Sequence, residues 1–444
     1  MPGGVDLNLD APVLVGFGVT GQAVCQALVK RSFKPNVVDD RPSDTSKFIA
    51  SSQGVELVEA PSKPQLDEII SGASILLPSP GVPDSHPCFA AATEHGVPIA
   101  SEFDLAQMWD SRPLLTVTGT NGKTTVTLLV ADALNQSGVT AVAVGNTDVP
   151  LVAAIDDENV DAFVVEASSF RLGHSYGFAP QVSCWLNFAP DHLDAHASFE
   201  SYKAAKASIW SNRPGDSIAI ANADDAVVAD LAPMDALMFS LNDPAATWHV
   251  ADGQLVGPGG PFVRVDSLQR CQPHDLANAL AAAAVAHAGG ASMDAITNVV
   301  KAFSGFRHRV ELVGTWDDVA WYNDSKATVP HATRSAVAGF ESVVLIAGGR
   351  NKGLDLSELR QAIPPVRAVV ATGDAAPEIT KVFAGHVPVE VAETMAAAVS
   401  TAADLSQQGD VVVLSPGCTS FDWYSSYTDR GNDFCDLVRK RHGA

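Results

Sequence analysis

The chain has 444 residues, 46% of them hydrophobic, and a formal net charge of −23 at pH 7. A chain of this length is typical of about three domains. Its acidity disfavours nucleic acid as a partner, because phosphate backbones are bound through Lys and Arg. It also disfavours stable association with anionic membranes. An anion bound by this acidic chain needs locally concentrated cations. A Lys or Arg in a glycine-containing turn is therefore a strong candidate for anion binding.

Cysteine spacing and the N-terminal residues indicate the compartment. The six cysteines are scattered without a C-x-x-C spacing, which predicts reduced thiols rather than a metal site or a disulfide framework. Residues 1–10, MPGGVDLNLD, lack a basic segment followed by an apolar run, so we expect no signal peptide and a cytoplasmic protein. The segment ANALAAAAVAHAGG is apolar but Ala-rich and short for a membrane span, and it predicts a packed helix.

Apolar, β-branched runs alternate with longer helical segments along the chain, which predicts α/β domains with parallel sheets covered on both faces. The runs expected to be strands are APVLVGFG, KPNVVDD, ASILLPSPG, RPLLTVTGT, AVAVGN, DAFVVEASS, QVSCWLNFAPD, SIAIAN, ESVVLIAGG, RAVVATGD and DVVVLSPG. The segment DGQLVGPGGPFVRV predicts a small hairpin with a Gly/Pro turn.

Three blocks divide the chain. Residues 1–105 open with the turn GFGVTG, residues 106–305 with GTNGKTT, and residues 306–444 contain NDSKATVP, AGGRNKG and LSPGCTSFDW. FSGFRHRVEL, at the border of the second and third blocks, predicts a hinge, because Gly305 supplies backbone freedom.

The first turn, GFGVTG at residues 16–21, follows a strand-like run and precedes a helix-like segment. Glycines let backbone amides approach a pyrophosphate, and a helix N-terminus favours negative charge. Asp39 lies about 20 residues further on, where a ribose-binding acid stands in a NAD site. The pattern predicts a phosphate-bearing nucleotide without saying which one. A tight strand–helix turn with no ligand is the alternative.

The second turn, GTNGKTT at residues 119–125, is more specific. Amides in such a turn can surround phosphates, Lys123 can bridge β- and γ-phosphate oxygens, and the Thr124 hydroxyl can bind Mg²⁺. Val117 stands where the ordinary P-loop has its first glycine, so this turn is a P-loop variant.

The run TGTNGKTT resembles the Mur ligases and the folylpolyglutamate synthases, which form amide bonds at the expense of ATP. Further matching motifs are EASSF at 166–170, NFAPDHLD at 187–194, YKAAK at 202–206, HDLAN at 274–278, HR at 308–309 and NDSKAT at 323–328. The resemblance extends over nearly the whole chain. It is strongest to the Mur ligases that add D-glutamate, through the ExSSF run and LSPGCTSFDWYSSYTDRGNDF. It implies a Rossmann-like N-terminal domain, a central P-loop-type ATPase domain with a parallel sheet, and a Rossmann-like C-terminal domain.

The resemblance implies that ATP phosphorylates the carboxylate of UDP-N-acetylmuramoyl-L-alanine and that D-glutamate attacks the acyl phosphate, in peptidoglycan precursor synthesis. Both steps bring anionic oxygens together, so cations and fixed donors are needed rather than a protein nucleophile. It further implies two Mg²⁺ sites, where Mn²⁺ can substitute, and a carbamylated Lys206, because an ammonium group cannot bind Mg²⁺. The implied catalytic residues are Lys123, Glu166, His192 and Lys206, and the implied metal ligands are Thr124, Glu166, His192 and Lys206.

Three sets of substrate-binding residues follow from the same resemblance. The set for ATP is Gly119, Thr120, Asn121, Gly122, Lys123, Thr124, Thr125, Asn278, Arg309, Asp324 and Lys326. The set for the UDP-sugar is Val19, Thr20, Asp39, Arg41, Ser79, Asn146, Ser168 and His192. The set for D-glutamate is Thr328, Lys352, Ser420, Phe421 and Tyr427. The second turn would then carry the chemistry, while the first holds the UDP of a small-molecule substrate, in a monomer.

Three positions depart from the family pattern. Asp148 stands where a glycine is more usual, Asp275 where an asparagine is, and Asn351 where an acid often supports the following lysine. The first adds negative charge near the expected sugar pocket, and the second alters the expected adenine contact. None of the three replaces an implied catalytic residue.

Other functions remain open at this stage. Another Mur ligase step or a polyglutamate-adding ligase would use the same motifs. A NAD-dependent oxidoreductase would use GFGVTG and Asp39, but it leaves GTNGKTT, Glu166 and His192 unexplained. A nucleotide sensor without activity would predict the loss of catalytic residues such as Lys123 or Lys206, and these are present.

Overall fold

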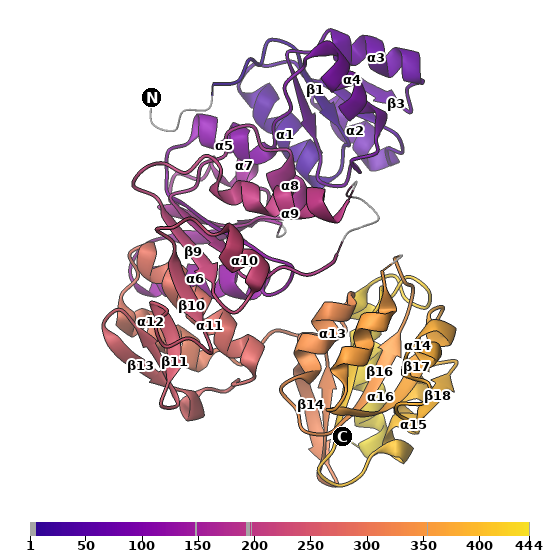
Figure 1. Ribbon diagram of the computed structural model, residues 1–444. Coiled ribbons are helices and arrows are strands. Elements are labelled where there is room, and N and C mark those ends of the chain that lie inside the picture. The colour runs from indigo at the N-terminus through magenta and orange to yellow at the C-terminus, as the bar shows by residue number, and fades with distance from the viewer. Residues whose placement is uncertain (1–5, 147–148, 192–195, 197, 353, 444) are drawn as a thin grey trace. The chain divides into compact units, whose positions relative to one another are not determined.

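The computed structural model describes residues 6–146, 149–191, 196, 198–352 and 354–443. Within these residues the strands form three sheets, of four, nine and six strands. The sheets follow one another along the chain, and helices pack against each of them (Figure 1). The predicted α/β class and three-domain organisation are confirmed. The borders predicted at 105/106 and 305/306 stay predictions.

The first sheet is parallel, with strand order β3-β2-β1-β4. Its strands are β1 (Pro12–Val15), β2 (Asn36–Asp39), β3 (Leu57–Glu59) and β4 (Ile75–Pro78), and its helices are α1 (Val19–Lys30), α2 (Asp44–Ser52), α3 (Lys63–Ser71) and α4 (Pro87–His95). Every residue of β1 and β4 is buried, as expected of apolar strands in a sheet covered on both faces. Asp39 and Ser79 therefore stand at the carboxyl ends of β2 and β4.

The second sheet has the order β13-β12-β11-β10-β9-β8-β5-β7-β6 and is parallel except at β12 and β13. Its strands are β5 (Leu114–Thr118), β6 (Ala141–Gly145), β7 (Ala162–Glu166), β8 (Val182–Trp185), β9 (Ile218–Asn222), β10 (Leu237–Ser240), β11 (Trp248–Ala251), β12 (Gln254–Gly257) and β13 (Gly260–Arg264). The helices of this part are α5 (Glu102–Trp109), α6 (Lys123–Gln136), α7 (Leu151–Ala154), α8 (Ser169–Gly173), α9 (Phe199–Ala207), α10 (Ala226–Leu231), α11 (Pro273–Ala288) and α12 (Met293–Ala302).

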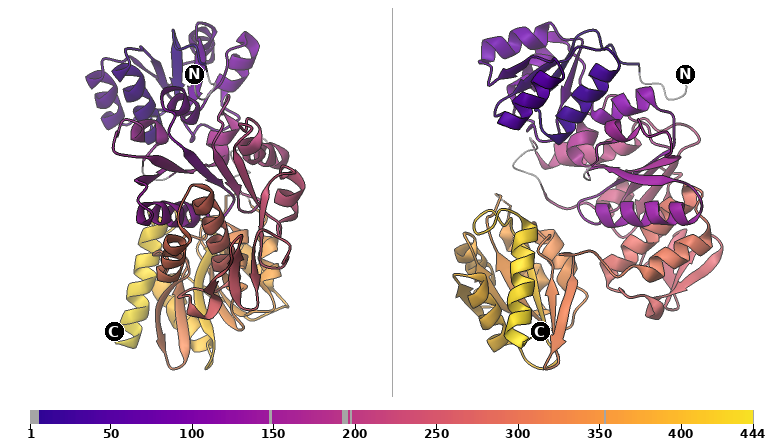
Figure 2. Two further views of the ribbon diagram at one scale, coloured as in Figure 1. Left: turned by 90° about the vertical axis from the view of Figure 1, so that its left-hand side faces the viewer. Right: turned by 180° about the vertical axis from the view of Figure 1, so that it is seen from behind.

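The third sheet has the order β14-β15-β19-β16-β17-β18, in which only β14 is antiparallel. Its strands are β14 (Glu311–Trp316), β15 (Val319–Asn323), β16 (Val343–Gly348), β17 (Val366–Thr372), β18 (Val389–Ala392) and β19 (Val411–Gly417). Two hydrophobic clusters cover its faces, one with α15 (Met395–Leu405) and α16 (Tyr427–His442), the other with α13 (Pro330–Val337) and α14 (Ala376–Phe383). Helices lie on both sides of its strands in two further views (Figure 2).

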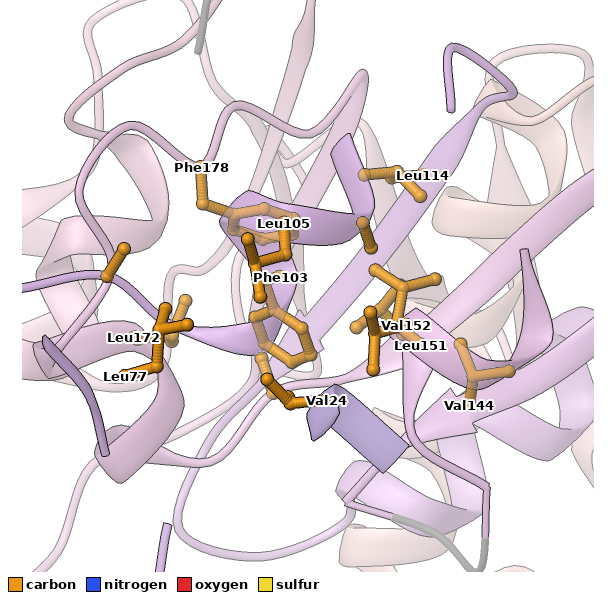
Figure 3. Close-up of a cluster of buried hydrophobic side chains, with 14 of the residues drawn as sticks. Val24, Leu77, Phe103, Leu105, Leu114, Val144, Leu151, Val152, Leu172 and Phe178 are labelled. Atoms are coloured by element: carbon orange, nitrogen blue, oxygen red, sulfur yellow. The ribbon is translucent and has the colours of Figure 1, made fainter. Parts of the chain in front are cut away.

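The largest hydrophobic core joins the first two sheets. It brings together Val24 of α1, Leu77 of β4, Phe103 of α5, Leu151 of α7 and Leu172 of α8, all buried (Figure 3). Removing this much apolar surface from water makes the two parts one compact unit. We call it the N-terminal unit. The C-terminal unit holds the third sheet with residues 189–191, 268–276 and 302–443.

The apolar runs predicted to be strands all form strands, β12 and β13 form the predicted hairpin, and the Ala-rich segment lies within α11. The prediction omitted the strands β3, β10, β11, β14, β15 and β18. Strands β3, β14 and β18 are partly exposed and are interrupted or bounded by polar residues or glycine. Strands β10 and β15 are short apolar runs with few β-branched residues, which do not by themselves distinguish a strand from a helix. No helix in the described part of the chain is long and apolar enough to span a membrane.

Candidate functional site

A cavity of about 690 Å³ lies at the carboxyl edge of the first sheet. Its wall is formed by the first turn after β1, by residues 39–41 at the end of β2 and by residues 79–83 after β4. His86, Asn146 and Arg171 complete the wall. The carboxyl edge of a parallel sheet is where open α/β folds bind ligands, and the volume suits a small molecule.

Six residues predicted to bind the UDP-sugar line this one cavity, namely Val19, Thr20, Asp39, Arg41, Ser79 and Asn146. Ser168 is not part of its wall. Its hydroxyl caps α8 by accepting a hydrogen bond from the Arg171 amide (3.4 Å). His192 lies outside the described residues.

The first turn is held by two side chains of the sheet edge. Asp39 accepts hydrogen bonds from the Phe17 amide (2.5 Å) and the Arg41 amide (2.8 Å), and the Ser79 hydroxyl donates to the Gly16 carbonyl (2.6 Å). The turn also needs glycine at residue 21, where a Cβ would lie 2.1 Å from the Gly16 carbonyl oxygen. Asp39 thus shapes the turn as well as lining the cavity.

Arg171 of α8 is only 5% exposed. Its guanidinium donates from Nε to Glu102, from Nη1 to the side-chain oxygen Oδ1 of Asn146 and from Nη2 to the Thr20 hydroxyl, each at 3.0 Å. The residues that it joins therefore come from α5, from the end of β6 and from the first turn.

The second turn connects β5 to α6. Gly122 has φ +83°, a left-handed conformation that favours glycine. Asn187, after β8, accepts hydrogen bonds through its side-chain oxygen from the Thr120 amide (3.0 Å) and the Asn121 amide (2.8 Å), and its Nδ2 donates to the Asn121 carbonyl (3.1 Å). The turn is therefore fixed from a neighbouring strand of the same sheet.

Two lysine ammonium groups converge on the Gly119 carbonyl oxygen, Lys123 at 2.9 Å and Lys206 at 2.7 Å. Lys206 is 2% exposed and its Nζ lies 4.8 Å from the centre of the Tyr202 ring. The structure thus brings together two of the predicted catalytic residues, from α6 and α9. Two ammonium groups beside a glycine-containing turn are suited to binding a polyphosphate.

Glu166 ends β7 and is 3% exposed. Its Oε1 accepts from Asn146 Nδ2 (3.2 Å), whereas the buried Oε2 has no hydrogen-bond partner among the described residues. A buried carboxylate oxygen without a partner is costly and is the kind of ligand that Mg²⁺ prefers. Magnesium bound to phosphates needs only one or two protein carboxylates, so Glu166 and Thr124, in the first turn of α6, fit that ion.

Asn278 of α11 packs against the second turn. A Cβ built on Gly122 would lie 2.3 Å from the Asn278 side-chain oxygen, so only glycine fits beneath it. The turn at 119–125 and Asn278, all predicted to bind ATP, therefore lie next to each other in the N-terminal unit.

In the C-terminal unit, Asp324 follows β15 and is buried. Its carboxylate accepts from the Val310 amide (3.2 Å) and the Ser415 hydroxyl (2.6 Å), and burial raises its pKa to about 7. Arg309 sits between His308 (φ +64°) and Val310 (φ +47°) in a left-handed turn. The Lys326 amide donates to the His308 carbonyl (3.1 Å), so the segments of the predicted residues Arg309, Asp324 and Lys326 lie together.

The segments that carry the predicted D-glutamate residues also meet in this unit. The Gly417 amide donates to the Ala327 carbonyl (3.0 Å), and the Arg350 amide donates to the Thr419 carbonyl (2.9 Å). These bonds bring the neighbourhoods of Thr328, Lys352 and Ser420 to one edge of the third sheet. The Ser325 hydroxyl donates to the Tyr427 carbonyl (2.8 Å), and Phe421 is 60% exposed.

Three family models match the chain. They are described as "Mur ligase MurD-like, N-terminal domain" (residues 10–101), "Mur ligase middle domain" (117–286) and "Mur ligase, glutamate ligase domain" (308–418). A curated relative from Frankia casuarinae, named UDP-N-acetylmuramoylalanine–D-glutamate ligase, is 41% identical over 97% of this chain and 94% of its own. A relative of the same name from Desulfosudis oleivorans is 37% identical over 96% of each chain.

The chain belongs to the Mur ligase family.

Solved structures agree on the fold of this Mur ligase. A pseudomurein peptide ligase type C from Methanothermus fervidus has a TM-score of 0.61 at 16% identity and covers 97% of this chain and 100% of its own. A UDP-N-acetylmuramate–alanine ligase from Thermotoga maritima has a TM-score of 0.57 at 17% identity, covering 98% and 100%.

Sequence reasoning missed three residues that shape the sites of this Mur ligase: Asn187, Arg171 and Arg430. Asn187 lies within the motif NFAPDHLD, but the sequence assigns it no role. Arg430, 4% exposed, donates to the Ser325 side chain and carbonyl (both 2.9 Å) and to the Cys418 carbonyl (3.2 Å), and burial lowers its pKa to about 10. The sequence feature that could have identified the two arginines is their charge. Arginine is scarce in this acidic chain, and an arginine is rarely buried without a charged or polar partner.

The departures from the family pattern have structural settings. Asp275 accepts from Arg270 Nε (2.9 Å), which neutralises it within the C-terminal unit. Asn351 donates to the Leu354 carbonyl (2.9 Å) and to Glu378 (3.2 Å), so it closes its own loop. Asp148 lies outside the described residues.

Proposed function

We propose that this Mur ligase joins D-glutamate to UDP-N-acetylmuramoyl-L-alanine, converting ATP to ADP and phosphate, in cytoplasmic peptidoglycan precursor synthesis. The observation that carries the proposal is the second turn, where Lys123 and Lys206 converge on one carbonyl within a P-loop-like turn. The substrates follow the printed name of relatives up to 41% identical over almost the full chain. We propose that the protein acts as a monomer on small-molecule substrates.

The reaction needs an activated carboxylate, because amide formation from a carboxylate and an amine is unfavourable in water. The muramoyl-alanine carboxylate attacks the γ-phosphate of ATP, and the amine of D-glutamate then attacks the resulting acyl phosphate and releases phosphate. Lys123 would neutralise charge on the transferring phosphoryl group, and the fixed amides of residues 119–125 would orient the phosphates. The remaining proposed ATP residues are Asn278, Arg309, Asp324 and Lys326.

Mg²⁺, for which Mn²⁺ can substitute, supplies charge neutralisation at the phosphates. We propose Thr124 and Glu166 as protein ligands of a first Mg²⁺, and His192 with a carbamylated Lys206 as ligands of a second. The unmodified ammonium group is buried and donates to Gly119. Carbamylation would convert this group into an anion, which can bind a second metal ion.

The other substrates are assigned to the remaining surfaces. The cavity beside the first turn would hold UDP, with Val19, Thr20, Asp39, Arg41, Ser79 and Asn146, and with Ser168 and His192 further along the substrate. D-Glutamate would bind through Thr328, Lys352, Ser420, Phe421 and Tyr427. Lys352 is chemically suited to this role, because a dicarboxylate needs a cation.

The test is phosphate release from ATP in the presence of UDP-N-acetylmuramoyl-L-alanine, with one amino acid added at a time. Release specific to D-glutamate, with a product heavier by one glutamyl residue, is the expected result. Release with another amino acid would move the enzyme to a different Mur ligase step. Absence of release with every amino acid, despite ATP binding, would overturn the proposed reaction.

A further inference from the structure

Arg171 has donors that the protein does not use. A guanidinium group carries five N–H donors, and the hydrogen bonds of Arg171 use Nε and one hydrogen on each terminal nitrogen. Within the described residues, one N–H on Nη1 and one on Nη2 therefore have no acceptor. The side chain is 6% exposed and Arg171 forms part of the cavity wall, so a ligand in the cavity can supply the missing acceptors.

The first turn of α1 offers further donors at the same place. The amides of Val19, Thr20 and Gly21 have no acceptor among the described residues, and Gly18 provides no side-chain cap. Such amides attract anions, because they carry the positive end of the helix dipole. Arg171 Nη2 lies 3.0 Å from the Thr20 hydroxyl, which places the guanidinium beside this turn.

The position of Arg171 is fixed before any ligand binds. Glu102, which also accepts from the Val152 amide (3.0 Å), holds Nε, while Asn146 and Thr20 hold the two terminal nitrogens. Helix α8 itself is anchored, because the Ser169 hydroxyl lies 2.8 Å from His196 Nε2 and His196 Nδ1 lies 3.2 Å from Asp84. A preorganised donor loses little entropy when an anion arrives.

An ion pair with Glu102 alone does not explain this arrangement. That pair engages Nε, and the two terminal nitrogens are instead directed by neutral oxygen atoms from two different segments. Each terminal nitrogen thus keeps one N–H group that these bonds do not use, on a side chain that lines the cavity. A guanidinium fork of this kind matches the oxygens of phosphates.

We propose that Arg171 binds the diphosphate of the sugar nucleotide, together with the first-turn amides of α1. This inference rests on the proposed function and adds to it a specificity residue that comes from the second sheet. The nucleoside end of the ligand would lie toward residues 39–41 on the same cavity wall, away from Arg171.

The experiment compares UDP with uridine by isothermal titration calorimetry on the full chain. Loss of a charged hydrogen-bond donor in Arg171→Gln should weaken UDP binding by about 10- to 100-fold. Binding of uridine, which has no phosphate, should change less than about twofold, as should binding of a non-hydrolysable ATP analogue. Equal loss for UDP and uridine, or no loss for UDP, would overturn the role.

Two further variants keep the test decisive. Arg213→Gln removes an arginine of the same unit that pairs with Asp235 (2.9 Å) outside the cavity wall, and UDP affinity should not change. If Arg171→Gln fails to fold because Glu102 is left buried and unpaired, Arg171→Lys keeps a charge beside it. That variant loses the fork, so UDP binding should still weaken while uridine binding does not.

The two proposals fail in different ways. If the wild-type chain makes the glutamyl product but Arg171→Gln binds UDP normally, only the role of Arg171 falls. If the wild-type chain binds UDP through Arg171 but makes no product from UDP-N-acetylmuramoyl-L-alanine, the diphosphate site stands and the proposed reaction falls.

Discussion

The first and second turns look alike in sequence, yet they obtain their positive charge in different ways. GFGVTG contains no Lys or Arg, and the buried cation beside it, Arg171, comes from a helix of the second sheet. GTNGKTT contains Lys123 and receives Lys206 at the same carbonyl. A turn that only holds a nucleotide needs modest charge, whereas a turn where phosphoryl transfer occurs needs dense charge at the reacting group.

The first turn is also linked to Glu166 at the end of β7. Thr20 accepts from Arg171, Arg171 donates to Asn146, and Asn146 donates to Glu166, with distances of 3.0, 3.0 and 3.2 Å. One chain of side-chain hydrogen bonds thus runs from the proposed diphosphate site to the proposed metal ligand. Asn146 contacts both Arg171 and Glu166, so its position affects the geometry of both proposed sites.

The largest effect should come from Lys123. We predict that Lys123→Ala lowers kcat/KM for phosphate release by about 10³-fold, because it removes a preorganised cation from the transition state. Calorimetric binding of UDP should be unchanged, since the first turn does not use this lysine. Activity near the wild-type level would show that the second turn does not carry the chemistry.

Lys206 should rank next. Lys206→Ala is expected to lose about 10²- to 10³-fold in kcat, and added bicarbonate should not restore activity because no amine remains to be carbamylated. Mass spectrometry of the wild-type chain in bicarbonate should detect the added carboxyl group. Full activity of Lys206→Ala would remove the carbamate from the mechanism.

One glycine-to-alanine substitution in each turn should have an intermediate effect and should distinguish the functions of the two turns. In Gly122→Ala a Cβ would meet Asn278 at 2.3 Å, and in Gly21→Ala it would meet the Gly16 carbonyl at 2.1 Å. We predict that the first variant raises KM for ATP and the second raises KM for the UDP-sugar, each by about 10-fold or more, because the backbone must shift. Melting temperatures measured in parallel would identify a variant that has simply unfolded, and a reversed pattern of KM changes would contradict the division of labour.

The smallest effect concerns Asp324. Its pKa is raised by burial to about 7, so the folded chain holds this proton more tightly than the unfolded chain. Its contribution to stability is present below the ordinary aspartate pKa and is lost as pH rises through about 7. Asp324→Asn should therefore reduce the fall in melting temperature between pH 5 and pH 8, by an amount corresponding to at most about 3 kcal/mol, because the linkage acts over about two pH units of that range. An identical pH dependence in both proteins would contradict the raised pKa.

The parts of the fold that could be predicted are those with a continuous local signal. Strands β1 and β16 are uninterrupted apolar runs, and burial on both faces of a parallel sheet requires such runs. Strand β3 has three residues and a partly exposed surface, and β14 lies at an edge where only one neighbour pairs with it. The sequence pattern of these two strands therefore does not distinguish them from loops.

The candidate sites divide along the same line. Glycine turns are visible because backbone conformation demands glycine at fixed spacing, and the residues within or beside them could be named in advance. Arg171 and Arg430 act on segments up to 151 and 105 residues away in the sequence. Such contacts depend on how sheets and helices pack, which no local pattern encodes.

The division between the turns can be tested most directly on the unmodified protein. Wild-type enzyme saturated with UDP would be titrated with a non-hydrolysable ATP analogue and Mg²⁺ in a calorimeter. We predict one analogue bound per chain, with an affinity close to that measured without UDP, because each ligand has its own turn. Loss of analogue binding in the presence of UDP would mean that a single turn serves both nucleotides, and it would contradict the assignment of diphosphate binding to one and phosphoryl transfer to the other.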